Sequence, residues 1–247
     1  QFLDNNKSIS IDARLDLIRG ISNGMYALHQ SNILHLDLKP PNVLINQNNV
    51  PWITDFGLAF AMSSSMSAGS TKSGRGTMQY KAPESFRPKK KGGSKTHKPT
   101  DVYSFSMLVW ETFTGAIPFA EKSDVDISNM HMEVYYGEDP ERPSLNQIPD
   151  QVQSIIDACW DHNFENRPTF ERLCERFDQI ERVETKEKTS NTEEHTTKPR
   201  IFLSYRRAHS GEARALKMEL NRLGYEVFFD LDRDSGLGIG PFQKQLE

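Results

Sequence analysis

Two short polar stretches carry the residue types that transfer of a phosphoryl group to a hydroxyl requires. That reaction needs a carboxylate beside the acceptor, an amine to neutralise developing charge, and oxygen ligands that hold Mg²⁺ against the phosphates. The first stretch, HLDLKPPN, supplies Asp37, Lys39 and Asn42, and the second, DFG, supplies Asp55. Each residue alone would be ordinary, because a lone Asp or Lys in a loop is usually a solvated charge.

Four later motifs follow at larger intervals. They are GTMQYKAPE ending at Glu84, DVYSF beginning at Asp101, WETFTG followed by PF, and CW followed by NRPTF, which contains Arg167. Together with HLDLKPPN and DFG they resemble, in order, the catalytic loop, the magnesium-binding loop, the activation-segment end and the C-lobe helices of the protein kinase family. Six ordered landmarks over about 135 residues are hard to obtain by chance.

The resemblance implies roles for the four polar residues of the first two stretches. Asp37 would orient or deprotonate the acceptor hydroxyl, and Lys39 would contact the transferred phosphoryl group. Asn42 and Asp55 would hold Mg²⁺, or Mn²⁺ in its place, on the phosphates of ATP. The substrates would be proteins.

Other matching positions are implied to be structural or regulatory. In kinases of this pattern His35 and Asp101 brace the catalytic loop, and Glu84 pairs with Arg167. Such an ion pair is structural, because either partner left buried alone costs about 3–5 kcal/mol. The full set is His35, Leu36, Gly57, Thr77, Glu84, Asp101 and Arg167.

The acceptor class is also implied by the resemblance. Lys39 within DLKP and Thr77 in the Gly-Thr pair before Ala-Pro-Glu resemble serine/threonine kinases rather than tyrosine kinases. DVYSF, Arg142-Pro143 and Cys-Trp resemble the tyrosine-kinase-like branch, whose members mostly phosphorylate Ser and Thr. The implied enzyme is therefore an ATP-dependent serine/threonine protein kinase.

Leu36 departs from the family pattern. Most kinases carry Arg immediately before the catalytic Asp, where the guanidinium pairs with a phosphorylated activation-loop residue. Because leucine cannot neutralise a phosphate, we expect activation here not to depend on that contact. The Ser/Gly-rich loop from Ser63 to Thr77 could be phosphorylated or only mobile, and the sequence leaves both open.

Helices and short strands are predicted around these motifs from the spacing of apolar residues. The segment from Ile11 to Gln30 carries apolar residues at helical spacing after Ser10, a suitable N-cap. The other predicted elements are strands at 43–45 and 52–54, a buried helix through 102–112, and helices at 151–160 and 169–182.

A second module is predicted after a polar stretch, 184–199, which lacks large apolar residues and fits a flexible linker. A strand at 200–205, a helix ending at Gly224 and a strand at 227–229 would form the start of a parallel sheet. These residues resemble the first half of a Toll/interleukin-1 receptor (TIR) domain, with an ordinary flavodoxin-like unit as the alternative. The implied interaction loop contains Asp230, Gly236, Gly238, Gly240 and Pro241.

The predicted fold class is therefore multidomain. A mainly α-helical protein-kinase C-lobe over residues 1–183, without its N-terminal lobe, is followed by the linker at 184–199 and a truncated α/β flavodoxin-like TIR module over 200–247. Because the N-terminal lobe of a kinase carries the loop that covers the phosphates, we expect the isolated chain to catalyse little or nothing.

Composition excludes several other classes. A net charge of −4 over 247 residues gives no general attraction to nucleic acid, and the basic run at 87–98 is expected to be a solvated insertion. No apolar run approaches the roughly 18 residues of a spanning helix, while membrane attachment through other parts of the protein stays open. The two cysteines lack metal-ligand spacing, which favours a reducing, cytoplasmic setting.

The combined interpretation is a signalling kinase whose TIR module assembles with other TIR domains and so concentrates the kinase on its substrates. Two alternatives stay open. One is an inactive kinase lobe serving as a TIR-controlled scaffold, against which the intact Asp37, Asn42 and Asp55 speak. The other is a TIR-type NAD hydrolase regulated by the kinase, and the Glu that some TIR domains use for this reaction would lie after Glu247.

Overall fold

The computed structural model describes residues 9–46, 48–54, 60–61, 78–86, 98–135, 141–180, 200–203, 217–218, 220–222, 224 and 226–229. The α-helices in these ranges are α2 (Ile11–Gln30), α3 (Lys98–Thr114), α4 (Asp124–Tyr135), α5 (Asp150–Cys159) and α6 (Phe170–Asp178). The 3₁₀ turns are η1 (Pro40–Asn42), η3 (Met78–Tyr80), η4 (Pro83–Phe86) and η5 (Phe164–Asn166). The strands are β1 (Ile33–Leu34), β2 (Val43–Ile45), β3 (Pro51–Ile53), β4 (Phe60–Ala61), β5 (Arg200–Leu203) and β6 (Glu226–Phe229).

The first described helix, α2, begins and ends where the sequence predicts. The Ser10 hydroxyl accepts a hydrogen bond from the Ala13 N–H at 3.1 Å, which satisfies one of the unpaired donors of the first turn. At the other end the Ser31 N–H donates to the Ala27 carbonyl, and Asn32 has a left-handed φ of 55° that turns the chain out of the helix. The predicted apolar face is buried and consists of Leu15, Ile18, Ile21, Met25 and Leu28.

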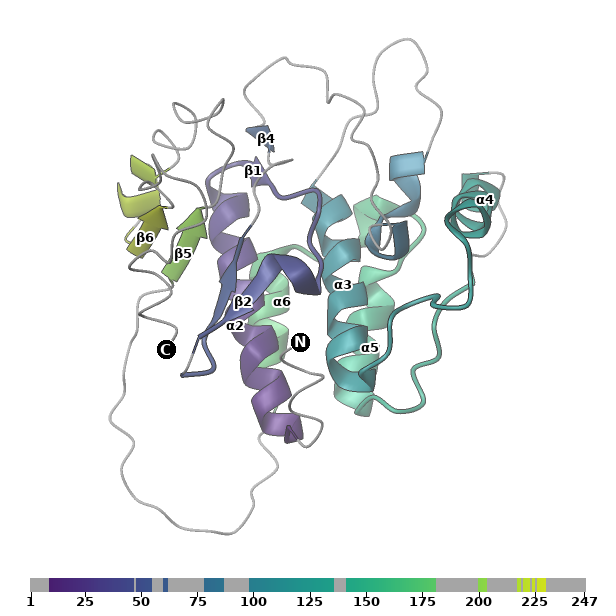
Figure 1. Cartoon of the computed structure of the whole chain (residues 1–247), viewed down its shortest axis with the longest axis horizontal. Coiled ribbons are helices and arrows are strands. Elements are labelled where there is room, and N and C mark those ends of the chain that lie inside the picture. Colours follow the sequence, from purple (N-terminus) through teal and green to yellow (C-terminus); the bar gives the residue numbers. More distant parts are fainter. Residues whose placement is uncertain are drawn as a thin grey trace, which may run out of the picture.

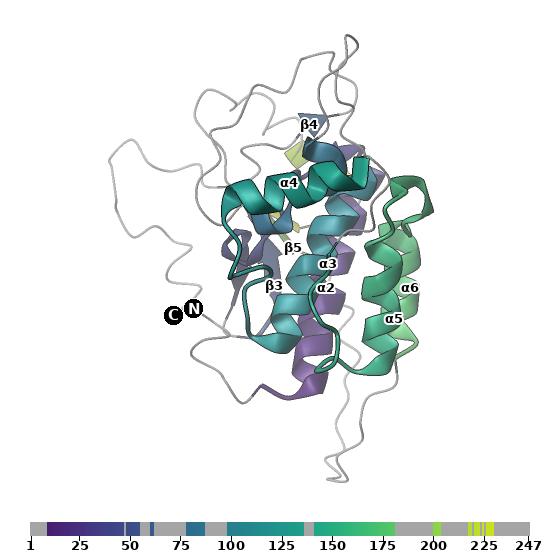
Figure 2. The same ribbon diagram turned by 90° about the vertical axis from the view of Figure 1, so that its right-hand side faces the viewer.

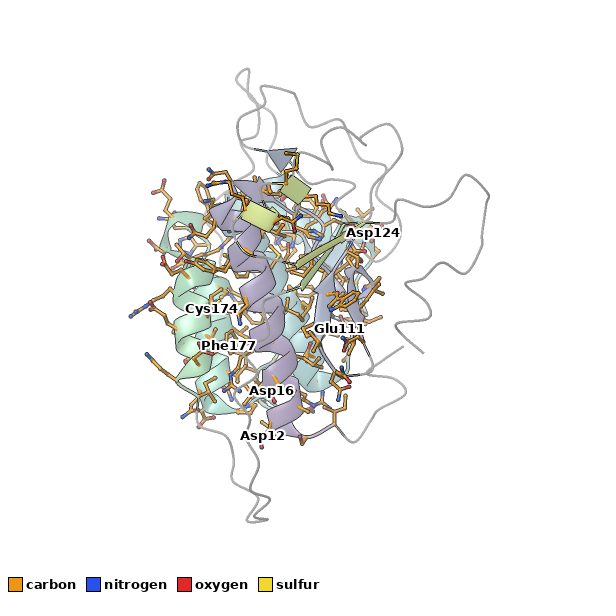
Figure 3. The ribbon with its side chains drawn as sticks, turned by 90° about the vertical axis from the view of Figure 1, so that its left-hand side faces the viewer. Asp12, Asp16, Glu111, Asp124, Cys174 and Phe177 are labelled. Atoms are coloured by element: carbon orange, nitrogen blue, oxygen red, sulfur yellow. The ribbon has the colours of Figure 1, made fainter. Side chains whose placement is uncertain are left out.

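Helices α2, α3, α5 and α6 pack side by side around the main core (Figure 1 and Figure 2). Helix α3 is buried along most of its length, from Thr100 to Trp110. The Phe105 ring lies edge-on to Phe170 and Phe177, at centroid distances of 5.2 and 6.0 Å, a geometry that aromatic pairs favour. Figure 3 shows Phe177 on α6, which packs closely against α2.

Arg19 joins α2 to the end of α6. Its Nε and Nη2 both donate to the Phe177 carbonyl at 3.1 Å, and Nη2 also donates to the Ile180 carbonyl at 2.8 Å. The last carbonyls of a helix have no partner within the helix and carry partial negative charge, so a guanidinium at this position stabilises the end of α6. The helix predicted at 169–182 is present as α6, and it is shorter than predicted, at Phe170–Asp178.

Strands β2 and β3 form an antiparallel hairpin that lies directly on α2. The two elements approach closely because α2 carries glycine at the contact. A Cβ atom on Gly20 would lie 2.5 Å from Pro51 Cγ, and one on Gly24 would lie 2.8 Å from Ile53 Cδ1. The hairpin thereby fixes the chain against α2 as far as Thr54.

Helix α4 is not among the predicted elements. Its buried side chains are Ile127, Met130 and His131, whose spacing is that of one helix face, so a signal is present in the sequence. The surrounding polar residues and the short length of the helix obscure that signal. Helix α4 packs mainly against η3 and η4, and Figure 2 shows it running across the direction of α3.

The last described segments form a two-stranded parallel sheet. Strand β5 pairs with β6 in the register that begins at Arg200↔Glu226. Between them residues 217–218 and 220–222 are helical, and Gly224 has a φ of 90°. The strand–helix–strand order predicted for this region is therefore present. The predicted linker and the Gly-rich loop lie outside the described residues.

Two further features concern the cysteine side chains and the character of the described helices. Cys159 and Cys174 are free thiols, and burial raises the pKa of Cys159 to about 12, so this side chain packs as a small neutral group. Among the described helices, none combines the length and the apolar character that crossing a bilayer requires.

Candidate active site

The site is built around a buried carboxylate, Asp101, on α3. Its Oδ2 accepts hydrogen bonds from the His35 N–H at 2.8 Å and lies 2.9 Å from His29 Nε2, and its Oδ1 accepts from the Leu36 N–H at 2.7 Å. The Asp101 side chain is 0% exposed. A carboxylate buried to this extent must be hydrogen-bonded, and here it gathers the end of α2 and the start of the 35–42 loop onto α3.

Leu36 is held in an unusual backbone conformation. Its φ of 65° lies in the left-handed region, which costs a residue other than glycine about 1 kcal/mol or more. The hydrogen bond from its N–H to Asp101 is charge-assisted and compensates for this strain. The conformation immediately before Asp37 is thus set by α3.

His35 is fully buried and neutral. Its Nδ1 accepts a hydrogen bond from the Asp37 N–H at 3.3 Å, and its Nε2 lies 3.1 Å from the Thr54 carbonyl. A ring nitrogen that accepts a hydrogen bond carries no proton, whereas a carbonyl partner requires a donor, so the proton is on Nε2. The ring therefore connects the backbone of Asp37 to the end of β3.

Asp37, Lys39 and Asn42 converge in one hydrogen-bonded cluster. Lys39 Nζ lies 2.7 Å from Asp37 Oδ2, and Asn42 Nδ2 lies 3.3 Å from the same oxygen and 2.8 Å from the Asp37 carbonyl. The Asp37 and Lys39 side chains are only 11% and 19% exposed. Because solvent screens such a pair poorly, its electrostatic interaction is stronger than that of an exposed pair.

The Asn42 amide has a fixed orientation. Both neighbours of its Nδ2 are acceptors, so the NH₂ group must point toward them. No described residue donates a hydrogen bond to its Oδ1. The Asn42 carbonyl accepts from the Thr54 N–H at 2.8 Å, which ties the cluster to the residue that precedes Asp55. Asp55 and Gly57 themselves lie outside the described residues.

Glu84 and Arg167 form a two-point ion pair, with Nη1–Oε1 at 2.8 Å and Nη2–Oε2 at 3.0 Å. The Arg167 side chain is fully buried and that of Glu84 is 8% exposed. Arg167 also donates to the carbonyls of Pro99 at 3.0 Å and Asp161 at 2.9 Å. The pair therefore joins η4 to the start of α3 and to the loop before α6.

A second contact joins the same segment to α3. The Tyr80 hydroxyl donates a hydrogen bond to Glu111. Burial and the neighbouring carboxylate raise the pKa of Tyr80 well above its usual value, so it remains a neutral donor. The segment 78–86 is thus fixed at two points, at Tyr80 by Glu111 and at Glu84 by Arg167. Thr77 lies outside the described residues.

Comparison with known proteins decides the family. A model of the protein kinase domain matches residues 1–177. The chain belongs to the protein kinase domain family. It is 34% identical over 165 residues to mitogen-activated protein kinase kinase kinase 12 of Rattus norvegicus, a match that covers 66% of this chain and 17% of that protein.

Two other relatives are similar over most of this kinase domain. Serine/threonine-protein kinase PkaA of Streptomyces coelicolor is 32% identical over 176 residues, covering 70% of this chain and 30% of the relative. Tyrosine-protein kinase Shark of Drosophila melanogaster is 34% identical over 182 residues, covering 71% and 18%. The chain spans less than a third of the length of each relative.

Several residues of this kinase domain's site were not among those singled out from the sequence. His29 is one of them, because a histidine on the buried face of a helix is more often a packed residue than a functional one. Thr54 acts through its backbone, so no side-chain pattern could reveal it. The remaining contacts depend on tertiary packing and involve Tyr80, Thr100 and Glu111.

Proposed function

We propose that the protein containing this chain transfers the γ-phosphoryl group of MgATP to hydroxyl groups of serine or threonine in other proteins. The supporting observation is that Lys39 Nζ and Asn42 Nδ2 lie 2.7 and 3.3 Å from the same carboxylate oxygen, Oδ2 of Asp37. A carboxylate, an ammonium and an amide oxygen are the groups that phosphoryl transfer to a hydroxyl uses.

Asp37 is proposed to act on the acceptor hydroxyl. Lys39 and Asn42 both donate to its Oδ2, whereas no described residue donates to its Oδ1. Oδ1 can therefore accept a hydrogen bond from an incoming hydroxyl, align it and take its proton. The Lys39 ammonium beside this carboxylate would stabilise the negative charge of the transferred group.

The residues present fit a divalent cation. Mg²⁺ prefers hard oxygen ligands, usually one or two carboxylates together with phosphate oxygens. The Asn42 amide oxygen and the Asp55 carboxylate are ligands of this type, and we assign Mg²⁺ to them, with Mn²⁺ as a substitute of similar preference. When bound, the ion neutralises charge on the phosphates.

Asp101, His29 and His35 are proposed to position the loop rather than to touch the substrate. The Asp101 carboxylate holds two consecutive N–H groups of the loop and the imidazole of His29. A shift of about 1 Å in a catalytic group can cost about a hundredfold in rate, so a rigid support of this kind has a direct effect on catalysis.

The acceptor class needs its own measurement. DLKP around Lys39 and the Gly-Thr at Thr77 favour serine and threonine. The Streptomyces relative is named a serine/threonine kinase and the Drosophila relative a tyrosine kinase. Phosphoamino-acid analysis of the product tests the assignment, and phosphotyrosine as the main product would contradict it.

We also propose that residues 200–247 begin a TIR module that assembles with other TIR domains in the cytoplasm. The parallel β5–β6 pair supports this proposal, because TIR domains and other flavodoxin-like units share that order. The contact loop would contain Asp230, Gly236, Gly238, Gly240 and Pro241. Sedimentation of the full protein tests it: removal of residues 200–247 should abolish self-association, and unchanged association would contradict it.

Replacing Asp37 with Asn tests the proposed reaction. The isosteric amide cannot take a proton, so we expect kcat of the full protein to fall by about 10²–10⁴, with little change in the KM for ATP. The matched control is Asp16→Asn, which removes an exposed carboxylate of α2 that Figure 3 labels. Radiolabelled ATP and a generic protein substrate give the readout, and a kcat equal to that of the control would contradict the proposal.

A further inference from the structure

Helix α4 has a histidine, His131, on its buried face, beside Ile127 and Met130. The His131 side chain is 1% exposed, and neither ring nitrogen has a hydrogen-bond partner among the described residues. The ring stacks on Phe86 of η4, with centroids 4.9 Å apart and an interplanar angle of 30°. It also meets the edge of Tyr103 of α3 at 6.0 Å. The His131 imidazole therefore packs as an aromatic ring between Phe86 and Tyr103, and it can still bind a proton.

Two charged residues near this ring act on its protonation in opposite directions. Glu84 favours the protonated ring and Arg167 disfavours it, and these two residues are paired with each other. Burial is the largest effect, and the pKa of His131 is lowered to about 4. The other titratable groups on α4 and on the described segments against it are Tyr80, Lys81, Lys98, Asp101, Tyr103, Glu111, Asp124, Asp126, Glu133 and Tyr135.

Most of the groups on the facing elements are engaged elsewhere. Tyr80 bonds Glu111, and Asp101 bonds His29. On α4 itself Asp126 accepts from the hydroxyl and N–H of Ser123 at the exposed start of the helix. Among the described residues neither nitrogen of His131 has a hydrogen-bond acceptor, so a protonated ring in this place would leave its N–H groups unpaired.

We propose that His131 makes the contact between α4 and the 78–86 segment sensitive to acid. With the ring neutral, α4 packs on η3 and η4. Protonation favours a state in which α4 has moved away from Phe86 and the ring is hydrated. The 78–86 segment then loses the packing that α4 provides and retains its bonds to α3 and Arg167. This inference does not depend on the proposed phosphotransfer activity.

The direction of the effect follows from linkage. The pKa of His131 is lower in the packed state than in an open, hydrated state, where it has the ordinary value of 6.5. The packed state is therefore fully favoured above that value, and the preference is lost as the pH falls toward 4. Between about pH 7.5 and about pH 5.5 the opening equilibrium should shift about tenfold.

Hydrogen exchange of the full chain tests the proposal. Protection factors, corrected for the intrinsic pH dependence of exchange, should fall about tenfold in α4 and in residues 78–86 between about pH 7.5 and about pH 5.5. The variant His131→Phe keeps the stacked ring and cannot titrate, so its protection in these segments should be independent of pH. His162→Phe, which removes an exposed histidine, should behave like the unmodified protein.

Two results would overturn the proposal. The first is the same pH-dependent loss of α4 protection in His131→Phe as in the unmodified protein. The second does not depend on any variant and comes from long-range ¹H–¹⁵N correlation spectra of the imidazole. If His131 protonates near its ordinary pKa while α4 stays protected, the proposed coupling is absent, whereas a ring that stays neutral until α4 opens supports it.

Discussion

At the scale of single residues, the candidate active site depends on Asp101 more than on any residue of the loop itself. The three groups hydrogen-bonded to it come from His29, His35 and Leu36. Together they fix the end of α2 and the strained backbone before Asp37. The functional groups of the loop therefore take their geometry from a buried carboxylate 64 positions later in the chain.

Leu36 leads to a prediction about regulation. Replacing Ser70 and Thr71 with Glu should change kcat/KM of the full protein less than about twofold, because leucine cannot pair with the added charge. Adding Leu36→Arg to that variant supplies a guanidinium that could pair with the added carboxylates, and it should raise the response to the Glu substitutions. A large rise in phosphotransfer while Leu36 is intact would contradict the prediction.

The sequence points to the candidate polar residues of the loop but not to the residues that support them. Asp37, Lys39 and Asn42 lie within six positions, so a local motif reveals them. His29 and Thr54 act through contacts that exist only after α2, β3 and α3 have packed together. Their roles could not be predicted from spacing, because a histidine on a buried helix face is more often a packed residue than a functional one.

At the scale of secondary-structure elements, the Glu84–Arg167 pair gives a stability prediction. Arg167→Met leaves the Glu84 carboxylate buried without its guanidinium and should lower the free energy of unfolding by about 3–5 kcal/mol. The double variant with Glu84→Gln should be less destabilised than the sum of the single variants, because neither charge is then left alone. Urea unfolding measures both quantities, and strictly additive losses would contradict this account.

The contact between α2 and β3 gives a second prediction. Alanine favours a helix over glycine by about 1 kcal/mol, but overpacking costs about 1–3 kcal/mol. Gly20→Ala meets the rigid Pro51 ring at 2.5 Å, so the clash should dominate and destabilise the protein. Gly24→Ala meets the end of the Ile53 side chain, at 2.8 Å from Cδ1, which is more flexible than the proline ring, so the loss of stability should be smaller.

Thermal unfolding tests this contrast between the two glycines. Asn23→Ala, at an exposed position of the same helix, is the control for helix propensity alone. Adding Pro51→Ala should recover part of the stability lost in Gly20→Ala. Equal melting temperatures for the two glycine variants would show that the hairpin does not limit the space beside α2.

The elements differ in how well the sequence predicts them. Helix α2 was predicted at its observed start and to about its observed end, because Ser10 caps it and the apolar face is uninterrupted. Helix α4 was missed, since its three buried residues stand in a short and largely polar segment. Strands β2 and β3 of the hairpin were predicted to within one residue, because turn residues mark the ends of their apolar runs.

At the scale of the whole molecule, the described helices form a support that carries both the loop at 35–42 and the segment at 78–86. Helix α3 is central to this arrangement, since it holds Asp101 and the Tyr80 partner Glu111. The parallel pair β5–β6 was predicted from its apolar runs and is present. Its assignment to a TIR module could not follow from this pair alone, because many α/β folds share that order.

The most direct test of the central claim is the phosphotransfer rate of the full protein carrying Asp55→Asn, measured with saturating MgATP. Loss of the carboxylate proposed to bind the metal would remove several kcal/mol of charge stabilisation, so the account predicts a fall of about 1,000-fold or more. The melting temperature should be unchanged, which separates loss of function from loss of fold. A variant that keeps its fold and transfers phosphate at the unmodified rate would contradict the claim that Asp37, Lys39, Asn42 and Asp55 act together on MgATP.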